Sequence, residues 1–161
     1  MTDPSSSPIH ATSGWDAVLA AVTTALGGEQ ERGRVLLLAC WADTGEADHA
    51  QRCVLAHYLA DLETDLDAEV GWDRVALEQH GDVGDGDLAV IGIPSARGML
   101  PSLHLNLADG LLRSGDVAGA TRHLEAGMAV SDALGDDGYG GMIRDGLQRL
   151  AERLGDVAAN R

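Results

Sequence analysis

Apolar residues recur along most of this chain at the spacing of an α-helix. Between residues 15 and 26 they follow an i, i+3, i+4, i+7 pattern, which places them on one side of a helix. Ser13 can cap this segment at its start, and the pair Gly27 and Gly28 can end it. Similar patterns predict helices over residues 30–43, 47–63 and 66–79, from near 100, from near 117, and over 138–154. The pattern therefore predicts an all-α fold of about seven helices.

Two segments depart from this pattern. Residues 1–13 are rich in Pro and Ser, so we expect a disordered tail there. Residues 80–98, HGDVGDGDLAVIGIPSARG, contain many glycines and Pro94, which argue against a continuous helix. The expected organisation is a tail followed by a single folded domain over residues 14–155.

The stretch SLHLNLADGLLRSGD, residues 102–116, is compatible with two elements. Its first six residues alternate between polar and apolar, like a half-buried strand. A helix accounts for the whole stretch, because its polar residues then share one stripe and its leucines lie on the opposite side. That stripe consists of Ser102, Asn106, Asp109 and Arg113. We therefore predict a helix, with His104 facing the core and Asn106 facing outward.

Two parts of the chain repeat one pattern of residue sizes. When residue 31 is aligned with residue 101, most marker positions agree, and one degraded unit fits between the two copies. In the second copy, Ala108 and Ala120 are small where two helices cross closely, and Gly115 closes the first helix. The segment LADGLLRSGDVAGATRHLEAGMA resembles the tetratricopeptide repeat, a pair of antiparallel helices of about 34 residues.

This resemblance implies a right-handed array of antiparallel helix pairs. Its units are expected at about residues 31–64, 65–98 (degraded) and 101–134, with residues 138–154 as a capping helix. In the family, polar positions on the first helix of each unit line a concave groove that binds peptide segments. Carried onto this chain, those positions are Arg32, Asp43, Glu69, Asp73, Ser102, Asn106, Asp109 and Arg113. An ordinary solvated helix face is the alternative interpretation of the same residues.

Composition and charge narrow the choice of partners. The formal net charge is −15, and the 11 basic residues, all arginine, form no cluster along the chain. Such a surface repels phosphate backbones and anionic lipid, so we expect neither nucleic acid nor membrane as a partner. Cys40 and Cys53 are too few for a disulfide framework and lack a metal-site spacing, which favours a cytoplasmic location with reduced thiols. The lack of lysine is typical of a GC-rich, bacterial genome.

Potentially reactive residues offer a second hypothesis. His57 and Asp61 lie one turn apart on the helix expected at 47–63, and His104 has a similar apolar setting. Together they suggest a buried His/Asp pocket that binds a small molecule or transfers a proton. A structural histidine, paired with Asp61 or with a backbone carbonyl, explains the same residues without chemistry. The sequence contains no nucleotide-binding loop, nucleophile signature or metal motif, so we expect no cofactor and no metal.

The acidic segment and the tryptophans favour structural interpretations. Asp82, Asp85 and Asp87 do not follow the ligand order of a calcium loop, and we expect a flexible, solvated loop. Trp41 and Trp72 occupy core positions of the repeat pattern, and Trp15 begins the first apolar stripe. Packing is the expected role of all three.

The leading functional hypothesis is a cytoplasmic, non-enzymatic module whose groove binds a protein or peptide segment. The alternative is a helical small-molecule-binding or enzymatic domain that uses His57, Asp61 and His104. A third hypothesis, self-association, would leave an uncovered apolar face on a terminal helix. The sequence does not predict the oligomeric state.

Overall fold

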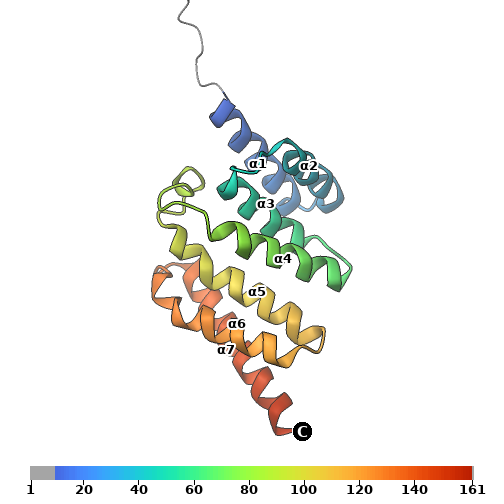
Figure 1. Ribbon diagram of the computed structural model, residues 1–161, viewed down its shortest axis with the longest axis vertical. Coiled ribbons are helices and arrows are strands. Elements are labelled where there is room, and N and C mark those ends of the chain that lie inside the picture. The colour runs from blue at the N-terminus through green and yellow to red at the C-terminus, as the bar shows by residue number, and fades with distance from the viewer. Residues whose placement is uncertain (1–9, 161) are drawn as a thin grey trace, which may run out of the picture.

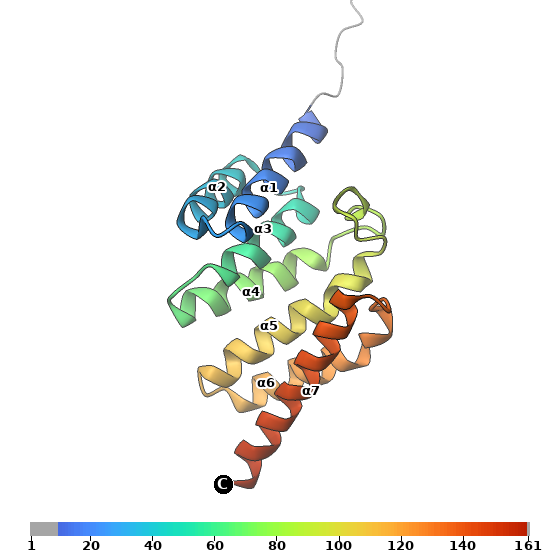
Figure 2. The same ribbon diagram turned by 180° about the vertical axis from the view of Figure 1, so that it is seen from behind.

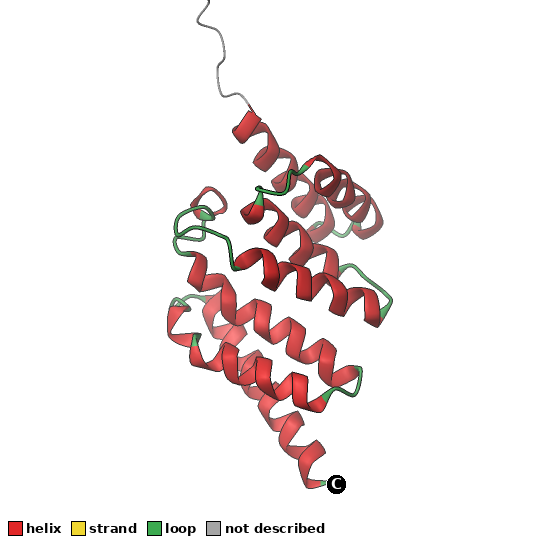
Figure 3. Ribbon diagram, in the orientation of Figure 1, coloured by secondary structure: helices red, strands yellow, loops and turns green. Residues whose placement is uncertain are grey.

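The computed structural model describes residues 10–160 of the chain and contains helices but no strands over that range (Figure 3). The all-α prediction is confirmed there. The α-helices are α1 (His10–Leu26), α2 (Gln30–Asp43), α3 (His49–Asp61), α4 (Leu66–His80), α5 (Leu100–Arg113), α6 (Val117–Ala129) and α7 (Gly138–Ala159). Short 3₁₀ turns lie at η1 (Ala89–Ile91), η2 (Ala96–Met99) and η3 (Ser131–Ala133).

The helix boundaries follow the sequence patterns closely, except at the start of α1 and at the end of α7, which extends to Ala159 beyond the predicted end at residue 154. α2 spans Gln30–Asp43 as predicted, and α5 and α6 begin at the predicted positions. α1 begins at His10 rather than after Ser13, so residues 10–13 of the expected tail belong to the helix. The rest of that tail, residues 1–9, lies outside the described residues.

Aspartates fix the first turns of α4, α6 and α7. Asp65, Asp116 and Asp137 each accept a hydrogen bond from the backbone N–H three residues later, at 2.9, 2.8 and 2.8 Å. Each bond satisfies an N–H that has no partner within its helix, and each carboxylate stabilises the positive end of the helix dipole. The α5–α6 turn requires Gly115, whose φ of 89° lies in the left-handed region.

Successive helices pack as hairpins, which stack along the long axis of the molecule (Figures 1 and 2). The most extensive contacts join α1 to α2, α3 to α4 and α5 to α6, while α7 packs against both α5 and α6. The predicted unit at 101–134 coincides with the α5–α6 hairpin. The predicted unit at 31–64 joins α2 to α3, whereas α3 packs far more extensively against α4 than against α2.

Residues 81–99 form turns instead of the second helix of a degraded unit. The segment nevertheless buries Leu88, Ala96 and Met99 against α1–α4. Asp82, Asp85 and Asp87 are exposed. The segment therefore covers one side of the core, while its aspartates face solvent together with Val90 and Arg97.

The interior consists of two apolar clusters that share α5. The first lies among α1–α4 and residues 81–99, and it includes Leu37, Leu55, Leu59, Leu88 and Leu103. The second lies among α4–α7, and it includes Leu107, Leu111, Leu124, Leu147 and Leu150. Because α5 supplies Leu103 to one cluster and Leu107 to the other, it joins the two halves of the fold.

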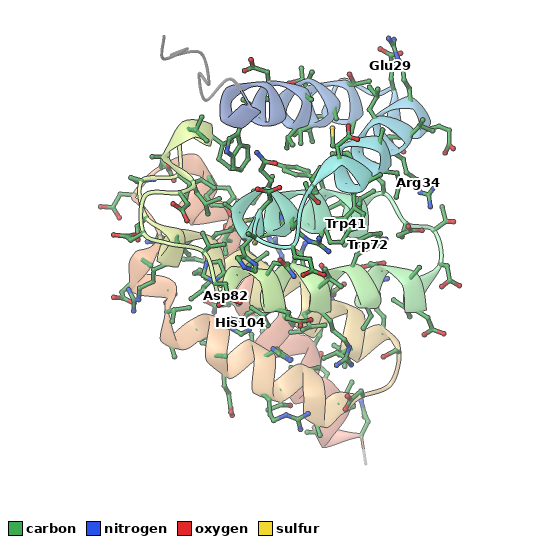
Figure 4. The ribbon with its side chains drawn as sticks, turned by 45° about the horizontal axis from the view of Figure 1, so that its top comes forward. Glu29, Arg34, Trp41, Trp72, Asp82 and His104 are labelled. Atoms are coloured by element: carbon green, nitrogen blue, oxygen red, sulfur yellow. The ribbon has the colours of Figure 1, made fainter. Side chains whose placement is uncertain are left out.

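The predicted packing role of two tryptophans agrees with their positions. Trp41 of α2 and Trp72 of α4 contact each other edge to face beside the first cluster, with ring centroids 5.0 Å apart (Figure 4). The indole N–H of Trp72 donates to Glu63, which also pairs with Arg34. The polar edge of Trp72 is therefore satisfied while its ring packs.

Glycines allow some helices to approach very closely. A Cβ atom at Gly33 would lie 2.5 Å from Cβ of Ala25 and 2.6 Å from its Cα, where α1 meets α2. A Cβ at Gly110 would lie 2.8 Å from Val70, where α4 meets α5. The chain contains no phenylalanine, and close contacts between small residues fill space in the core that large side chains would otherwise occupy.

We predict that Gly33→Ala lowers the free energy of unfolding by about 1–3 kcal/mol, because the new methyl group meets the backbone of Ala25. Gly71→Ala is the matched control, since its added Cβ on exposed α4 surface meets nothing within 4 Å. This control should raise stability by about 0.5–1 kcal/mol. Urea denaturation measures both changes, and equal stabilisation by the two substitutions would contradict the close α1–α2 contact.

Candidate functional site

Two clefts open on the polar surface of the described structure. The larger, of about 860 Å³, lies between α1, the α2–α3 connection and the turn that follows α4. The smaller, of about 350 Å³, lies where the end of α3 meets α4, α5 and α7. Both volumes fall within the range of about 300–1,000 Å³ that is typical of ligand pockets.

Carboxylates dominate the larger cleft. Its lining includes Asp43, Asp48, Asp82 and Asp87, together with Trp15 and His49, and no arginine is among the lining residues. Asp48 accepts a hydrogen bond from Gly45 N–H at 2.6 Å, and Asp87 accepts one from Gly84 N–H at 2.8 Å. These two carboxylates hold turns in place. Asp43 and Asp82 accept no side-chain hydrogen bond from the described residues, and both are exposed.

The thiol in the larger cleft is not an activated nucleophile. Burial of Cys40 raises its pKa, and the negative charge of Asp43 raises it further. A thiol in such surroundings stays protonated at neutral pH. Within residues 10–160, no group of three or more His, Cys, Asp or Glu side chains is arranged to hold a metal ion.

An ion-pair network joins three helices around the smaller cleft. Asp109 of α5 accepts hydrogen bonds from Arg113 Nε at 2.8 Å and from Arg153 of α7 at 2.6 Å. Arg113 also pairs with Glu69 of α4. These side chains are partly exposed, so each pair stabilises the fold only modestly, by about 0–1 kcal/mol. Their main effect is to fix where the charges lie.

A hydrogen bond also links α3 to α5 at this cleft. The side-chain amide of Asn106 donates to Asp61 at 3.3 Å, a long distance for such a bond. Asp61 and Asn106 both line the cleft, together with Glu69, Asp109, Arg149 and Arg153 and the apolar Leu105 and Leu150.

Asp73 of α4 is a buried carboxyl group next to this network. Its side chain is 2% exposed, and its Oδ2 has no hydrogen-bond partner among the described residues. Burial raises its pKa to about 8, and the negative charges of Asp61, Glu69 and Asp109 add to the shift while Arg113 opposes it. The Asp73 side chain is therefore mostly a neutral carboxylic acid at pH 7.

His57 and Asp61 influence each other as the sequence suggested. Burial lowers the pKa of His57, and the charge of Asp61 opposes that shift. The pKa of Asp61 is raised by loss of solvation, and the charge of His57 opposes the rise. His57 was predicted to pair with Asp61 or a backbone carbonyl, and its Nδ1 makes no such bond, because this buried atom has no partner in the described structure.

His104 pairs with a residue outside the proposed His/Asp pocket. Its Nδ1 is 3.1 Å from Nδ1 of His123, so α5 and α6 share a histidine–histidine hydrogen bond. Burial lowers the pKa of both rings, and each lowering favours the neutral form that such a bond requires. The hydrogen bond of His104 is therefore made to His123 and not to His57 or Asp61.

The structure brings together four of the eight predicted groove residues. Glu69, Asn106 and Asp109 line the smaller cleft, next to Asp61 from the alternative set, and Arg113 pairs with Glu69 and Asp109. Asp43 lines the larger cleft, while Arg32 pairs with Glu29 at the exposed start of α2.

Two groove predictions are wrong about exposure. Ser102 is 2% exposed, and its hydroxyl donates to the carbonyl of Met99 at 2.9 Å. Its place in the first turn of α5 turns it toward the buried 3₁₀ segment. Asp73 is equally buried, because α5 approaches α4 closely at Gly110.

Sequence reasoning missed several residues of both clefts. Arg149 and Arg153 of α7, the helix predicted to cap the array, line the smaller cleft. Asp48 and Asp87 line the larger cleft, and each also accepts a hydrogen bond that holds a local turn. Helical periodicity contains no signal for these positions, because they depend on how distant helices cross.

The first hairpin exposes apolar side chains. Leu26 is 72% exposed and Val35 57% exposed, and Leu36 lies beside Val35 on the outer side of α2. The run VLLLAC therefore occupies both faces of α2, with only Leu37 fully buried. Over residues 10–160, no helix combines the length and the apolar character needed to cross a bilayer.

No protein-family model, curated protein or solved structure matches this chain. The resemblance to the tetratricopeptide repeat therefore stays a prediction.

We predict that Asp73→Asn changes the pH dependence of stability. The folded pKa of Asp73, about 8, exceeds its ordinary value of 3.8, so the folded state keeps a proton that the unfolded chain loses. The contribution of the protonated Asp73 to the stability of the fold is therefore present below about pH 4 and is lost as the pH rises toward 8. The variant should match the natural protein near pH 4 and be more stable at pH 9 by roughly 1–3 kcal/mol.

The measurement is the free energy of unfolding in urea at several pH values between 4 and 9. Asp145→Asn, at an exposed position of α7, controls for the loss of one negative charge. A variant of Asp73 that follows the same pH curve as this control would contradict the buried, protonated carboxyl.

Proposed function

We propose that this chain is a protein-interaction module that binds a positively charged peptide segment in the larger cleft. The observation that carries the proposal is the lining of this cleft, where Asp43, Asp48, Asp82 and Asp87 converge from three segments without an arginine. In a protein with a net charge of −15, such a cleft attracts cations over a long range.

The size and chemistry of the cleft support a peptide as the ligand. A volume of about 860 Å³ accommodates several side chains of an extended segment. Lysine and arginine side chains form charge-assisted hydrogen bonds with carboxylates. Trp15 adds an aromatic wall on which a guanidinium group or a methylene chain can pack.

We also propose that the hairpins form a tetratricopeptide-like, right-handed array in a cytoplasmic protein. Support comes from the α5–α6 hairpin, where Ala108 and Ala120 are both fully buried and Gly115 makes the predicted turn. Cys40 and Cys53 are both free thiols, as a reducing compartment maintains them. Arrays of this kind present elongated surfaces to peptide partners.

The alternative of an enzyme with a His57–Asp61–His104 pocket receives less support. His104 contacts His123 instead, and Nδ1 of His57 meets no described partner that would orient it for proton transfer. Because His104 bonds His123 and Nδ1 of His57 has no partner in the described structure, binding is favoured over catalysis.

The test compares two double variants of equal charge. Asp43→Asn with Asp82→Asn removes the two lining carboxylates that hold no turn, while Asp145→Asn with Asp156→Asn removes two exposed charges from α7. Fluorescence anisotropy measures binding of a labelled eight-residue peptide of alternating Arg and Ala. We expect the cleft variant to bind at least about tenfold more weakly, and the α7 variant to change less than about twofold.

Equal losses in the two variants would show attraction by net charge alone and would contradict a site in this cleft. Affinity capture from the native host with both variants then tests the same assignment on natural partners. We expect the proteins retained by the α7 variant to be missing from the capture with the cleft variant.

A further inference from the structure

The outer face of α2 is apolar and has a charged residue at each end. The structure describes α2 in full, and between Arg32 and Asp43 its exposed side chains are all apolar. They are Val35, Leu36, Ala39 and Ala42. Steps of three or four residues place these positions on one side of the helix, away from the buried Gly33 and Leu37. α2 lies at the edge of the molecule, with α1 and α3 packed on its inner side (Figure 1).

α1 adds a second apolar stripe beside this face. Leu19 and Leu26 are 38% and 72% exposed, and they share one side of α1 because they lie two turns apart. Leu26 directly follows Ala25, and a Cβ at Gly33 of α2 would lie 2.6 Å from Cα of Ala25. Leu26 therefore borders α2. The hydroxyl of Thr23, between the two leucines in the sequence, donates to the carbonyl of Leu19 at 2.8 Å, so its proton is not available to solvent.

The other end of the stack of hairpins has a different surface. α7 closes that end (Figures 1 and 2), and its exposed side chains are mostly charged. They include Asp145, Arg149, Glu152 and Arg153. In stacks of helix pairs, a polar outer face on the terminal helix keeps the protein soluble. α7 has such a face and α2 does not, which indicates that a further apolar surface covers α2.

The order of charges along α2 makes its outer face complementary to itself. Arg32 and Asp43 lie three turns apart, about 16 Å along the helix axis. If two copies of α2 pack antiparallel about a two-fold axis near Leu37, Arg32 of each copy lies opposite Asp43 of the partner subunit. The same axis places Leu36 opposite Ala39 of the partner subunit. A large side chain then meets a small one, as close packing of helices requires.

We propose that the outer face of α2 binds a second copy of this chain in an antiparallel, two-fold symmetric pair of helices. Val35, Leu36 and Ala39 of each copy form the centre of the contact, and Arg32 pairs with Asp43 of the partner subunit at each end. The pair that Arg32 forms with Glu29 of its own helix is 69% and 59% exposed, so exchanging it costs little. The antiparallel arrangement also brings opposite ends of the helix dipoles together.

The size of the contact predicts a dimer of modest affinity. α2 contains 14 residues and is therefore about 21 Å long, so two copies of it bury less surface than a standard protein interface. Leu19 and Leu26 of α1 border the contact and enlarge it. We expect a dissociation constant in the micromolar range.

Sedimentation equilibrium of the full chain, between about 1 and 500 μM, measures the fraction of dimer. Leu36→Asp should weaken dimerisation at least about tenfold, because it buries a charge at the centre of the contact. Met142→Asp is the matched control, since Met142 is 56% exposed on α7, and it should change the affinity less than about twofold. Circular dichroism checks the fold of each variant. If Leu36→Asp does not fold, Val35→Asp, at a position that is 57% exposed, takes its place with the same expected loss.

An exchange of charges tests the antiparallel register. Arg32→Asp and Asp43→Arg should each weaken the dimer about tenfold, because like charges then face each other at both ends of the contact. The double variant Arg32→Asp with Asp43→Arg should restore the affinity to within about threefold of the natural protein, since each end again pairs opposite charges. Arg122→Asp, at an exposed position of α6, controls for the change in net charge and should leave the dimer unchanged.

Three results would overturn the proposal. They are a monomer at about 500 μM, a dimer that Leu36→Asp leaves intact, and a double charge variant as weak as the single variants. A monomer would assign the apolar face to a different protein or to residues 1–9 of the same chain. Asp43 also lines the larger cleft, so Asp82→Asn, which alters the cleft alone, should leave the dimer unchanged. Failure of the peptide proposal therefore does not affect this result.

Discussion

The packing of α5 between two apolar clusters is the constraint on which the rest of the structure depends. Leu103 belongs to the cluster among α1–α4, and Leu107 and Leu111 belong to the cluster among α4–α7. A helix with only one apolar face could not pack against both clusters. Because α5 packs against both, it needs small residues at the points where neighbouring helices come close. Gly110 meets this need toward α4, and Ala108 is fully buried within the second cluster.

The smaller cleft follows from this position of α5. The polar side of α5 places Asn106 beside Asp61 of α3, and Asp109 and Arg113 beside Arg153 of α7 and Glu69 of α4. The same close approach buries Asp73, whose Oδ2 has no hydrogen-bond partner in the described structure. Residues 81–99, which lead into α5, contribute Asp82 and Asp87 to the larger cleft, which Asp43 and Asp48 also line.

Local features of the fold were predictable because helical periodicity and capping act over a few residues. The limits of α2 and the starts of α5 and α6 show this well. The pairing of the helices was less predictable. The pattern of residue sizes that aligns residues 31 and 101 does not reveal that α3 packs more extensively against α4 than against α2. The polar stripe of α5 was found, but the side on which α4 would approach it was not. Ser102 and Asp73 were therefore expected on the surface, and Arg149 and Arg153 were not expected in a cleft.

Native-state hydrogen exchange tests the central role of α5 most directly. If α5 joins the two clusters into one cooperative unit, the amides of Leu107, of Leu55 in the first cluster and of Leu150 in the second should exchange with the same free energy. That free energy should equal the free energy of global unfolding. A free energy for Leu55 or Leu150 lower than that of Leu107 by more than about 1.4 kcal/mol, a tenfold difference in opening, would contradict the account.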